Sequence, residues 1–307
     1  MPPHGPSELG GSRGVRPPVT IEFVVAFSSI GLLHPGEMGA GIGATLVRAG
    51  RQVSWASSGR GASSARRAGA AGLVDVHTVE AMAHACDLII SVCPPSAALD
   101  VARQVAGFGG TYLDANAIAP ATAREVATVV EQGGGRYVDG GIIGAPPSPS
   151  GSPRLYVSGP SASSVRDLFA GTTVQALVVS EDQAAASALK MCFAAWTKGT
   201  GALLLDVRAL AIAEGVEGPL LAEWEHSLPD LAERSLLSAQ QAATKGWRWV
   251  GEMDQIAATF RAAGLPDGFH RAAAEIYARP DRDEVAAADA RTLGVVLRAL
   301  LGGPGPD

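Results

Sequence analysis

The sequence predicts an α/β fold with a doubly wound parallel sheet, followed by an all-α C-terminal domain. In the first half of the chain, short apolar runs alternate with helical patterns rich in Ala, Arg and Glu. This alternation is typical of strand–helix–strand units in a parallel sheet. From Glu181 onward the strand patterns stop and long helical segments dominate. We therefore expect two domains that meet near residue 181.

The alternation gives an expected range for each element. Strands are expected at 25–33, 52–55, 87–92, 110–113, 136–138 and 154–158, with helices between them at 38–49, 60–70, 78–84, 96–105 and 121–131. In the second half, helices are expected at 182–213, 217–226, 229–242, 248–263, 268–278 and 283–301. Pro229, Pro266 and Pro280 lie at the boundaries of these helices, where proline is tolerated. The expected organisation is a disordered tail over 1–18, a nucleotide-binding domain over 19–181 and a helical substrate and dimerisation domain over 182–307.

Composition excludes several classes of function. The 307 residues carry a net charge of −6, and no basic cluster suggests a nucleic-acid surface. The apolar stretch 20–33 is shorter than the roughly 20 residues that a membrane-spanning helix needs, so no membrane segment is expected. The three cysteines have neither an even count nor the spacing of metal ligands. They favour a protein of the reducing cytoplasm without a metal site.

A Gly-rich turn follows the first expected strand and opens the first expected helix. It reads His34-Pro35-Gly36-Glu37-Met38-Gly39, a His-x-Gly-x-x-Gly pattern. Free N–H groups and the dipole at a helix N-terminus bind a pyrophosphate, as in the first βα turn of a Rossmann fold. His34 stands where the pattern usually begins with glycine, either as a ring that contacts the cofactor or as a turn residue held by Pro35. The expected cofactor contacts here are Leu33, His34, Pro35, Gly36, Glu37 and Met38.

The tip of the second expected strand predicts which dinucleotide binds. An NAD enzyme places a carboxylate there for the ribose 2′-hydroxyl, but this chain has Ser57, Ser58 and Arg60, with no carboxylate before Asp75. Hydroxyls and a guanidinium suit a 2′-phosphate, so the sequence favours NADP (NADPH) over NAD. The alternative is that these are turn residues and a surface charge.

Two further strand ends face the expected cofactor. Val92-Cys93-Pro94 ends one strand with residues that cannot continue a ladder, and it is either a ribose contact or a simple turn. Asn116 follows the next strand and offers a neutral amide to the nicotinamide. Asp114, two residues earlier, is either part of this site or a buried cap.

These motifs together resemble the β-hydroxyacid dehydrogenases, a family that includes 6-phosphogluconate and 3-hydroxyisobutyrate enzymes and the related imine reductases. The matching features are Gly36 to Gly39, Asp114 to Pro120, Asp139 to Gly144 and Lys190, in that order. His34 to Gly39 and the region from Trp247 to His270 are more similar to a poorly characterised actinobacterial branch labelled phosphogluconate-dehydrogenase-like. The resemblance implies substrate contacts at Gly141, Ile142 and Ile143, and a homodimer formed through the helical domains.

Lys190 is the expected general acid/base. It lies in an otherwise apolar helix, where a charge is costly without a purpose, and it falls on the catalytic lysine of the family. Helical spacing puts Lys198 on roughly the same face, where it meets either an anionic end of the substrate or solvent. His270 is either a substrate contact or a structural histidine at a helix start.

Three departures from the family put its ordinary substrate in doubt. Ala194 and Ile143 replace polar residues that hold a substrate carboxylate and hydroxyl, and Gly251-Glu252 stands where a Lys-Asp pair is usual. The expected function is NADP-dependent hydride transfer between the nicotinamide and a hydroxyacid or related carbonyl substrate, a small molecule. The alternatives are an imine or ketone reductase, which usually lacks this lysine, and an NADPH-binding sensor without turnover.

Overall fold

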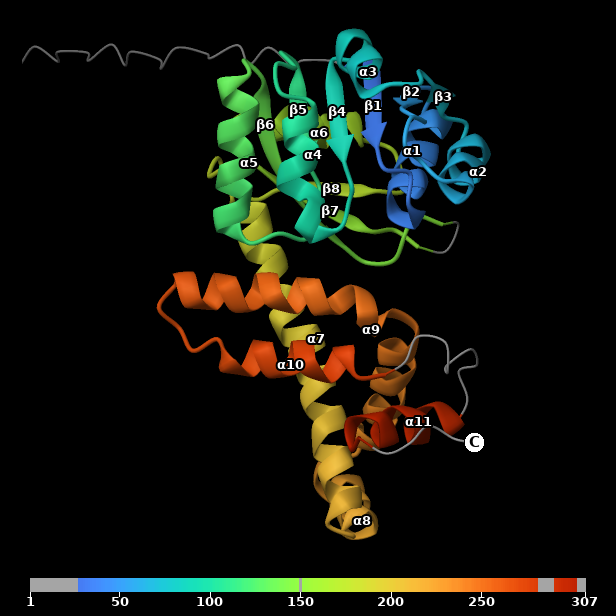
Figure 1. Ribbon diagram of the computed structural model, residues 1–307, viewed down its shortest axis with the longest axis vertical. Helices are drawn as coiled ribbons and strands as arrows, with labels where there is room; N and C mark the ends of the chain where they lie inside the picture. Colours follow the sequence, from blue (N-terminus) through green and yellow to red (C-terminus); the bar gives the residue numbers. More distant parts are fainter. Residues whose placement is uncertain (1–26, 149–150, 281–289, 303–307) are drawn as a thin grey trace, which may run out of the picture.

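The protein folds into an α/β domain and a helical domain joined by one long helix (Figure 1). The computed structural model describes residues 27–148, 151–280 and 290–302. The eight strands of one sheet run in the order β3-β2-β1-β4-β5-β6-β7-β8. Their bounds are β1 Ser29–Leu33, β2 Gln52–Trp55, β3 Val74–Asp75, β4 Leu88–Ser91, β5 Thr111–Asp114, β6 Arg136–Ile143, β7 Arg154–Ser158 and β8 Gln175–Val178.

Helices cover both faces of this sheet. The helices of the first domain are α1 Glu37–Arg48, α2 Ala62–Ala70, α3 Val79–Ala85, α4 Ala98–Gln104, α5 Pro120–Gln132 and α6 Ala162–Leu168, with the 3-10 turn η1 Pro95–Ala97. Leu46 of α1 and Val165 of α6 belong to the core on one face, whereas Val101 of α4 and Val126 of α5 belong to the core on the other. This two-sided burial confirms the predicted Rossmann fold class.

The sheet departs from the expected pattern at its far edge. All its pairs are parallel except β6 with β7, which are antiparallel with Gly141 opposite Tyr156. The sequence pattern did not find β3, β8 or α6. β3 has only two residues, both exposed, and β8 is a half-exposed edge strand, so neither shows the apolar run of a buried strand.

The second domain is all-helical in its described part. It comprises α7 Ala185–Ala213, α8 Glu217–Ser227, α9 Leu231–Ala262, α10 Gly268–Ala278 and α11 Ala290–Leu300. α7, α9, α10 and α11 share one core that includes Met191, Leu205, Ile256 and Tyr277. The expected tail 1–18 and the expected start of the last helix at residue 283 lie outside the described residues.

The expected break between 242 and 248 was wrong, because α9 is one uninterrupted helix. Gly246, within the expected break, lies inside this helix and is buried. A side chain at Gly246 would come within 3.4 Å of the Tyr277 carbonyl oxygen. The glycine therefore lies where α10 packs on α9 and does not end a helix.

Candidate active site

The Gly-rich turn joins β1 to α1 with the N-terminus of the helix open. Gly36 is the N-cap residue in an extended conformation, and no described side chain caps the helix. A side chain at Gly36 would meet no atom within 4 Å, whereas one at Gly39 would lie 2.6 Å from the His34 carbonyl oxygen. The turn therefore leaves room beside Gly36 and needs glycine at 39 for its own packing. An uncapped helix N-terminus beside open space fits a bound pyrophosphate.

His34 keeps the backbone conformation that the first glycine of the pattern usually supplies. Its φ is 68°, in the left-handed region, and its carbonyl oxygen accepts a 2.7 Å hydrogen bond from the Gly36 N–H. Burial, with the nearby charge of Arg60, lowers the pKa of His34 to about 4. The ring is therefore neutral at pH 7, and its buried Nδ1 has no hydrogen-bond partner among the described residues.

Arg60 lies on the same side of the site as the turn, since its charge acts on both His34 and Cys93. Ser57 is half-buried and Ser58 is exposed at the end of β2. Ser57 also hydrogen-bonds to Asp75, so a carboxylate does reach this edge from β3. The sequence pattern missed this proximity, because β3 is too short to be recognised and its pairing with β2 was not expected.

A second arginine supports the turn. Arg67 of α2 donates a 2.9 Å hydrogen bond from Nε to the carbonyl oxygen of Pro35. On the side of the helical domain, Arg248 of α9 forms a 3.1 Å ion pair with Glu37, the first residue of α1. The turn therefore contacts α2 on one side and the helical domain on the other. Neither arginine belongs to a sequence motif, so the sequence reasoning had no signal for them.

Asn116 ties the ends of β4 and β5 together. Its Oδ1 accepts a 2.5 Å hydrogen bond from the Cys93 N–H, and its Nδ2 donates one of 3.2 Å to Ser91 Oγ. The Asn116 N–H in turn donates to Asp114 Oδ1 at 3.0 Å. The amide therefore fixes the loop that carries Cys93 and keeps one N–H and one oxygen lone pair for a ligand. Burial raises the pKa of Asp114 to about 7.

A buried carboxylate on β6 anchors the start of α7. Asp139 accepts hydrogen bonds from the N–H of Ser187 (2.7 Å), from Ser187 Oγ (2.6 Å) and from Ser158 Oγ (3.2 Å). Ser187 lies in the first turn of α7, where backbone N–H groups have no partner within the helix. These bonds fix the position of α7, which places Lys190 one turn further along.

Glycine brings α7 close to β6 at this level. A side chain at Gly141 would lie 2.9 Å from the Ala186 carbonyl oxygen and 3.0 Å from Lys190 Cβ. Because the strand and helix touch, Lys190 Nζ reaches the carbonyl oxygen of Ile142 and donates a 2.9 Å hydrogen bond. The residues of the Asp139–Gly144 motif thus position Lys190 and fix the direction of its amine.

Glu252 of α9 lies between the two lysines of α7. Its Oε1 is 2.6 Å from Lys198 Nζ and 3.6 Å from Lys190 Nζ. Lys198 also lies over the Trp249 ring, 5.5 Å from its centre. Burial raises the pKa of Glu252, but the charges of Lys198 and Lys190 outweigh it and hold that pKa below its ordinary value. In the sequence, Glu252 was noticed only as a departure from the family. The available signal was a carboxylate directly before an apolar residue, Met253, which the structure shows to be buried.

The remaining expected substrate residues differ in their surroundings. Ile142 and Ile143 are buried at the end of β6, and Ala194 is fully buried one turn beyond Lys190. His270 is buried on α10, where its ring packs 4.2 Å from the Phe260 ring and 5.7 Å from the Phe269 ring, between centres. It lies against α7 at Gly199, beyond Lys198 along the helix.

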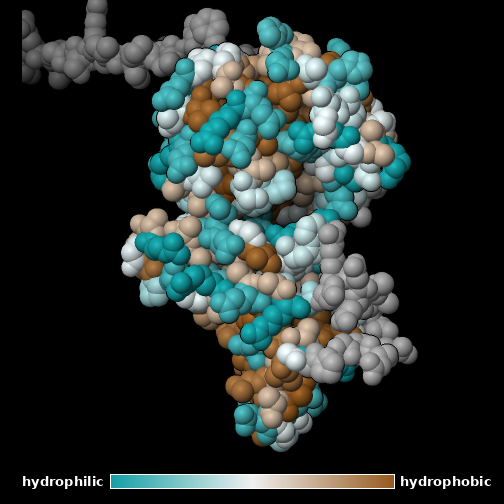
Figure 2. Space-filling model, in the orientation of Figure 1, coloured by the Kyte–Doolittle hydropathy of each residue, from teal (hydrophilic) through white to brown (hydrophobic). Residues whose placement is uncertain are grey.

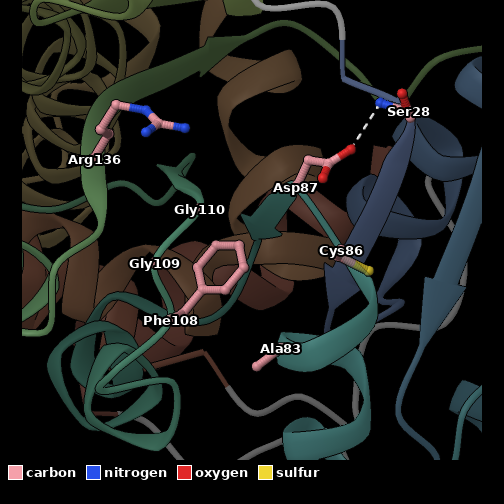
Figure 3. Close-up of a pocket in the computed structure, with 8 residues that line it drawn as sticks. All are labelled: Ser28, Ala83, Cys86, Asp87, Phe108, Gly109, Gly110 and Arg136. Atoms are coloured by element: carbon pink, nitrogen blue, oxygen red, sulfur yellow. Dashed lines mark hydrogen bonds between the residues drawn. The ribbon is translucent and has the colours of Figure 1, made fainter.

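A separate cavity of about 550 Å³ lies at the opposite edge of the sheet (Figure 3). Its lining comes from the amino ends of the strands, including Asp87 before β4 and Arg136 at the start of β6. Asp87 accepts a 3.0 Å hydrogen bond from the Ser28 N–H there. Ligands of open α/β sheets bind at the carboxyl ends of the strands, so this cavity is not the dinucleotide site.

Among the described residues, no group of histidine, cysteine and carboxylate side chains is arranged to hold a metal ion. None of the helices between residues 27 and 302 that the structure describes is long and apolar enough to cross a membrane.

Comparisons with known proteins agree with this geometry. The model for the NAD binding domain of 6-phosphogluconate dehydrogenase matches residues 28–169, and a domain of unknown function, DUF1932, matches 211–279. A search of curated proteins gives no match.

Solved structures share the fold over nearly the whole chain. A conserved hypothetical protein from Sinorhizobium meliloti has a TM-score of 0.69 at 24% identity, covering 91% of this chain and 99% of its own. The 3-hydroxyisobutyrate dehydrogenase of Mycobacterium tuberculosis, solved with L-serine, has a TM-score of 0.62 at 19% identity, covering 88% and 98%. A reductive aminase from Aspergillus terreus, solved with NADPH and ethyl levulinate, has a TM-score of 0.53 at 20% identity, covering 88% and 98%.

Residues 28–169 match the nucleotide-binding domain of an NAD(P)-dependent oxidoreductase, 6-phosphogluconate dehydrogenase. The chain as a whole shares the fold of solved 3-hydroxyisobutyrate dehydrogenases, and its membership of the β-hydroxyacid dehydrogenase superfamily stays a prediction. Its assignment to an actinobacterial branch stays a prediction.

Proposed function

We propose that the protein is an NADP-dependent oxidoreductase that uses Lys190 as general acid/base on a hydroxyacid or related carbonyl substrate. The observation that carries this proposal is the Lys190 amine, which is held by Ile142 and Glu252 at the carboxyl end of β6. That edge of the sheet also carries the open turn at Gly36 and the Cys93–Asn116 loop.

The residues present fit NADP. The uncapped start of α1 and the space beside Gly36 suit the pyrophosphate, and Arg60 beside His34 suits the 2′-phosphate. Asp75 near Ser57 works against this preference, because its carboxylate repels a second negative charge. Asp75 already accepts hydrogen bonds from His77 and Ser57, which offset part of its negative charge. We therefore give the attraction of Arg60 for a 2′-phosphate more weight than the repulsion by Asp75, and we favour NADP.

When bound, the nicotinamide accepts a hydride in oxidation and supplies one in reduction. In oxidation, the neutral Lys190 amine takes the proton of the substrate hydroxyl; in reduction, its ammonium protonates the carbonyl oxygen. The hydrogen bond to Ile142 and the anchoring of α7 by Asp139 keep the amine aimed at one place. The Asn116 bridge fixes the ends of the neighbouring strands β4 and β5.

The substrate side favours a less polar partner than an ordinary small hydroxyacid. Ala194 and Ile143 are buried apolar residues close to Lys190, so no polar group from these positions meets a carboxylate or a second hydroxyl. This apolar lining favours a ketone or imine reductase as the second candidate. Retention of Lys190 favours the hydroxyacid chemistry, so we rank that first.

A homodimer through the helical domain is part of the proposal. Large apolar residues stand exposed along one face of α7 at helical spacing: Trp196, Leu203, Val207 and Leu210. Trp196 is 70% exposed and Leu210 is 60% exposed. The second half of α7 and α8 form the lower end of the molecule in Figure 1, and Figure 2 shows that apolar residues gather on the surface there. Exposed apolar stretches of this kind mark protein interfaces, and a second copy covers it here. A cytoplasmic location stays a prediction from the cysteine content.

The test is a substrate screen with NADPH and NADH consumption as the readout. The panel holds β-keto acids, simple ketones and cyclic imines, with 3-hydroxyacids assayed in the reverse direction. Turnover of a hydroxyacid–keto acid pair that prefers NADP(H) supports the first candidate. Turnover confined to imines supports the second, and tight NADPH binding without turnover on any substrate would replace both by a sensor.

A further inference from the structure

We propose that Glu252 is a positioning residue that holds Lys190 at the reaction site and links it to Lys198, so that Glu252 and Lys198 act in opposite directions on the protonation of Lys190. This inference rests on the proposed role of Lys190. It assigns a function to a carboxylate and a second lysine that take no direct part in the proposed proton transfer.

Geometry is the first argument. One carboxylate oxygen of Glu252 lies within 4 Å of both ammonium groups, at 2.6 Å from Lys198 and 3.6 Å from Lys190. The three side chains are only 11% to 14% exposed, so water screens the cluster weakly. Opposite charges this close shift a titration by about 1 to 3 pH units, and like charges shift it the other way.

The asymmetry of the cluster is the second argument. Glu252 pairs closely with Lys198 and less closely with Lys190. Lys198 is further fixed by the Trp249 ring, whereas Lys190 keeps a hydrogen bond to Ile142 at the carboxyl end of β6. Burial lowers the pKa of Lys198, with Lys190 adding to the effect and Glu252 opposing it. The arrangement leaves Lys190 as the member that is free to exchange a proton with substrate.

Other ionisable groups near Lys190 do not duplicate this role. On β6, the Asp139 carboxylate already accepts three hydrogen bonds from Ser187 and Ser158, and it forms no ion pair with Lys190. On α10, His270 packs between aromatic rings, and burial lowers its pKa, so it is uncharged at pH 7. Glu252 is therefore the carboxylate that acts directly on the Lys190 ammonium among the described residues.

The chain offers a direct test because it contains only three lysines, Lys190, Lys198 and Lys245. Protein carrying ¹³C at the lysine ε-carbon gives three signals, which Lys→Met substitutions assign. The titration midpoint of the Lys190 signal is then followed by NMR in the full-length protein without substrate or cofactor. Glu252→Gln should lower this midpoint by about 1 to 3 pH units, and Lys198→Met should raise it by up to about 1 pH unit. Lys245→Met, which removes an exposed positive charge from the same helix as Glu252, should leave it unchanged.

The opposite signs separate the proposal from a merely structural role, since a loosened helix would move the midpoint in one direction in every variant. An unchanged or raised midpoint in Glu252→Gln would overturn the proposal. If that variant does not fold, an unchanged or lowered midpoint in Lys198→Met overturns it instead. Failure of the proposed function gives a different outcome. In that case Lys190→Met keeps full turnover, while the Lys190 midpoint still moves as stated in Glu252→Gln and Lys198→Met.

Discussion

The glycines at positions 36 and 39 of the turn should respond differently to the same added methyl group. In Gly39→Ala, the new Cβ would lie 2.6 Å from the His34 carbonyl oxygen, whereas ordinary contacts begin near 3.4 Å. The backbone must move by about 0.8 Å in a packed turn, which costs about 1 to 3 kcal/mol of folding free energy. We therefore expect Gly39→Ala to lower the urea midpoint of unfolding and to weaken NADPH binding as well.

In Gly36→Ala the protein itself has room. The φ of Gly36 is −69°, which alanine adopts freely, and its Cβ would meet nothing within 4 Å. The gain from a less flexible unfolded chain and the loss of a preferred N-cap residue nearly cancel, so stability should change by less than about 0.5 kcal/mol. If the pyrophosphate occupies that room, the methyl group displaces it and NADPH affinity falls by about tenfold or more, equal to about 1.4 kcal/mol.

Urea unfolding and fluorescence titration with NADPH measure the two effects separately. Wild-type NADPH affinity in Gly36→Ala would refute the assignment of this turn as the pyrophosphate site. Unchanged stability in Gly39→Ala would refute the packing argument.

Three further predictions concern the rest of the molecule. Arg60→Ala should weaken NADPH binding by about tenfold and leave NADH binding unchanged, because a half-exposed charge-assisted contact contributes about 1 to 2 kcal/mol. The control is Arg51→Ala, which removes an exposed arginine before β2. An equal loss of affinity for both dinucleotides in Arg60→Ala would contradict the 2′-phosphate role. Burial raises the pKa of Asp114 from 3.8 to about 7, so the folded protein holds a proton that the unfolded chain releases in this window, and stability is lost as pH rises through it. Asp114→Asn should therefore gain stability relative to wild type between about pH 4 and pH 7.5, by at most about 4 kcal/mol, and a difference independent of pH in urea unfolding would argue against it. Leu210→Glu should convert a dimer into a monomer in light scattering, whereas Val74→Glu, at an exposed apolar residue of β3, should not; identical masses for both variants would count against the α7 interface.

The parts of the fold that repeat a strong local pattern could be predicted from the sequence. The strands that became β1, β2, β4 and β5 are short buried runs, and the turn at His34 carries its own signature, so the Rossmann fold class followed. β3 and β8 could not be found, because exposed or edge strands lack an apolar run. The continuity of α9 was missed because the helix packs on α7, α10 and α11, and contacts between residues far apart in the chain leave no local pattern.

The same distinction holds for the site. Lys190 is visible in the sequence as a charge in an apolar helix, and the Asp139 motif marks its neighbours. Glu252 lies 62 positions beyond Lys190, on another helix, and only the packing of α9 on α7 brings the two together. The hydrogen bond from Arg67 to Pro35 likewise depends on tertiary packing.

The most direct test of the central claim measures kcat and the Kd for NADPH in one variant, Lys190→Met. On any substrate that the wild-type protein turns over, we predict that kcat falls by at least about 100-fold while the Kd for NADPH stays within about twofold, because general acid/base catalysis contributes about 10² to 10⁴ in rate. A Lys190→Met protein that keeps wild-type kcat would contradict the account.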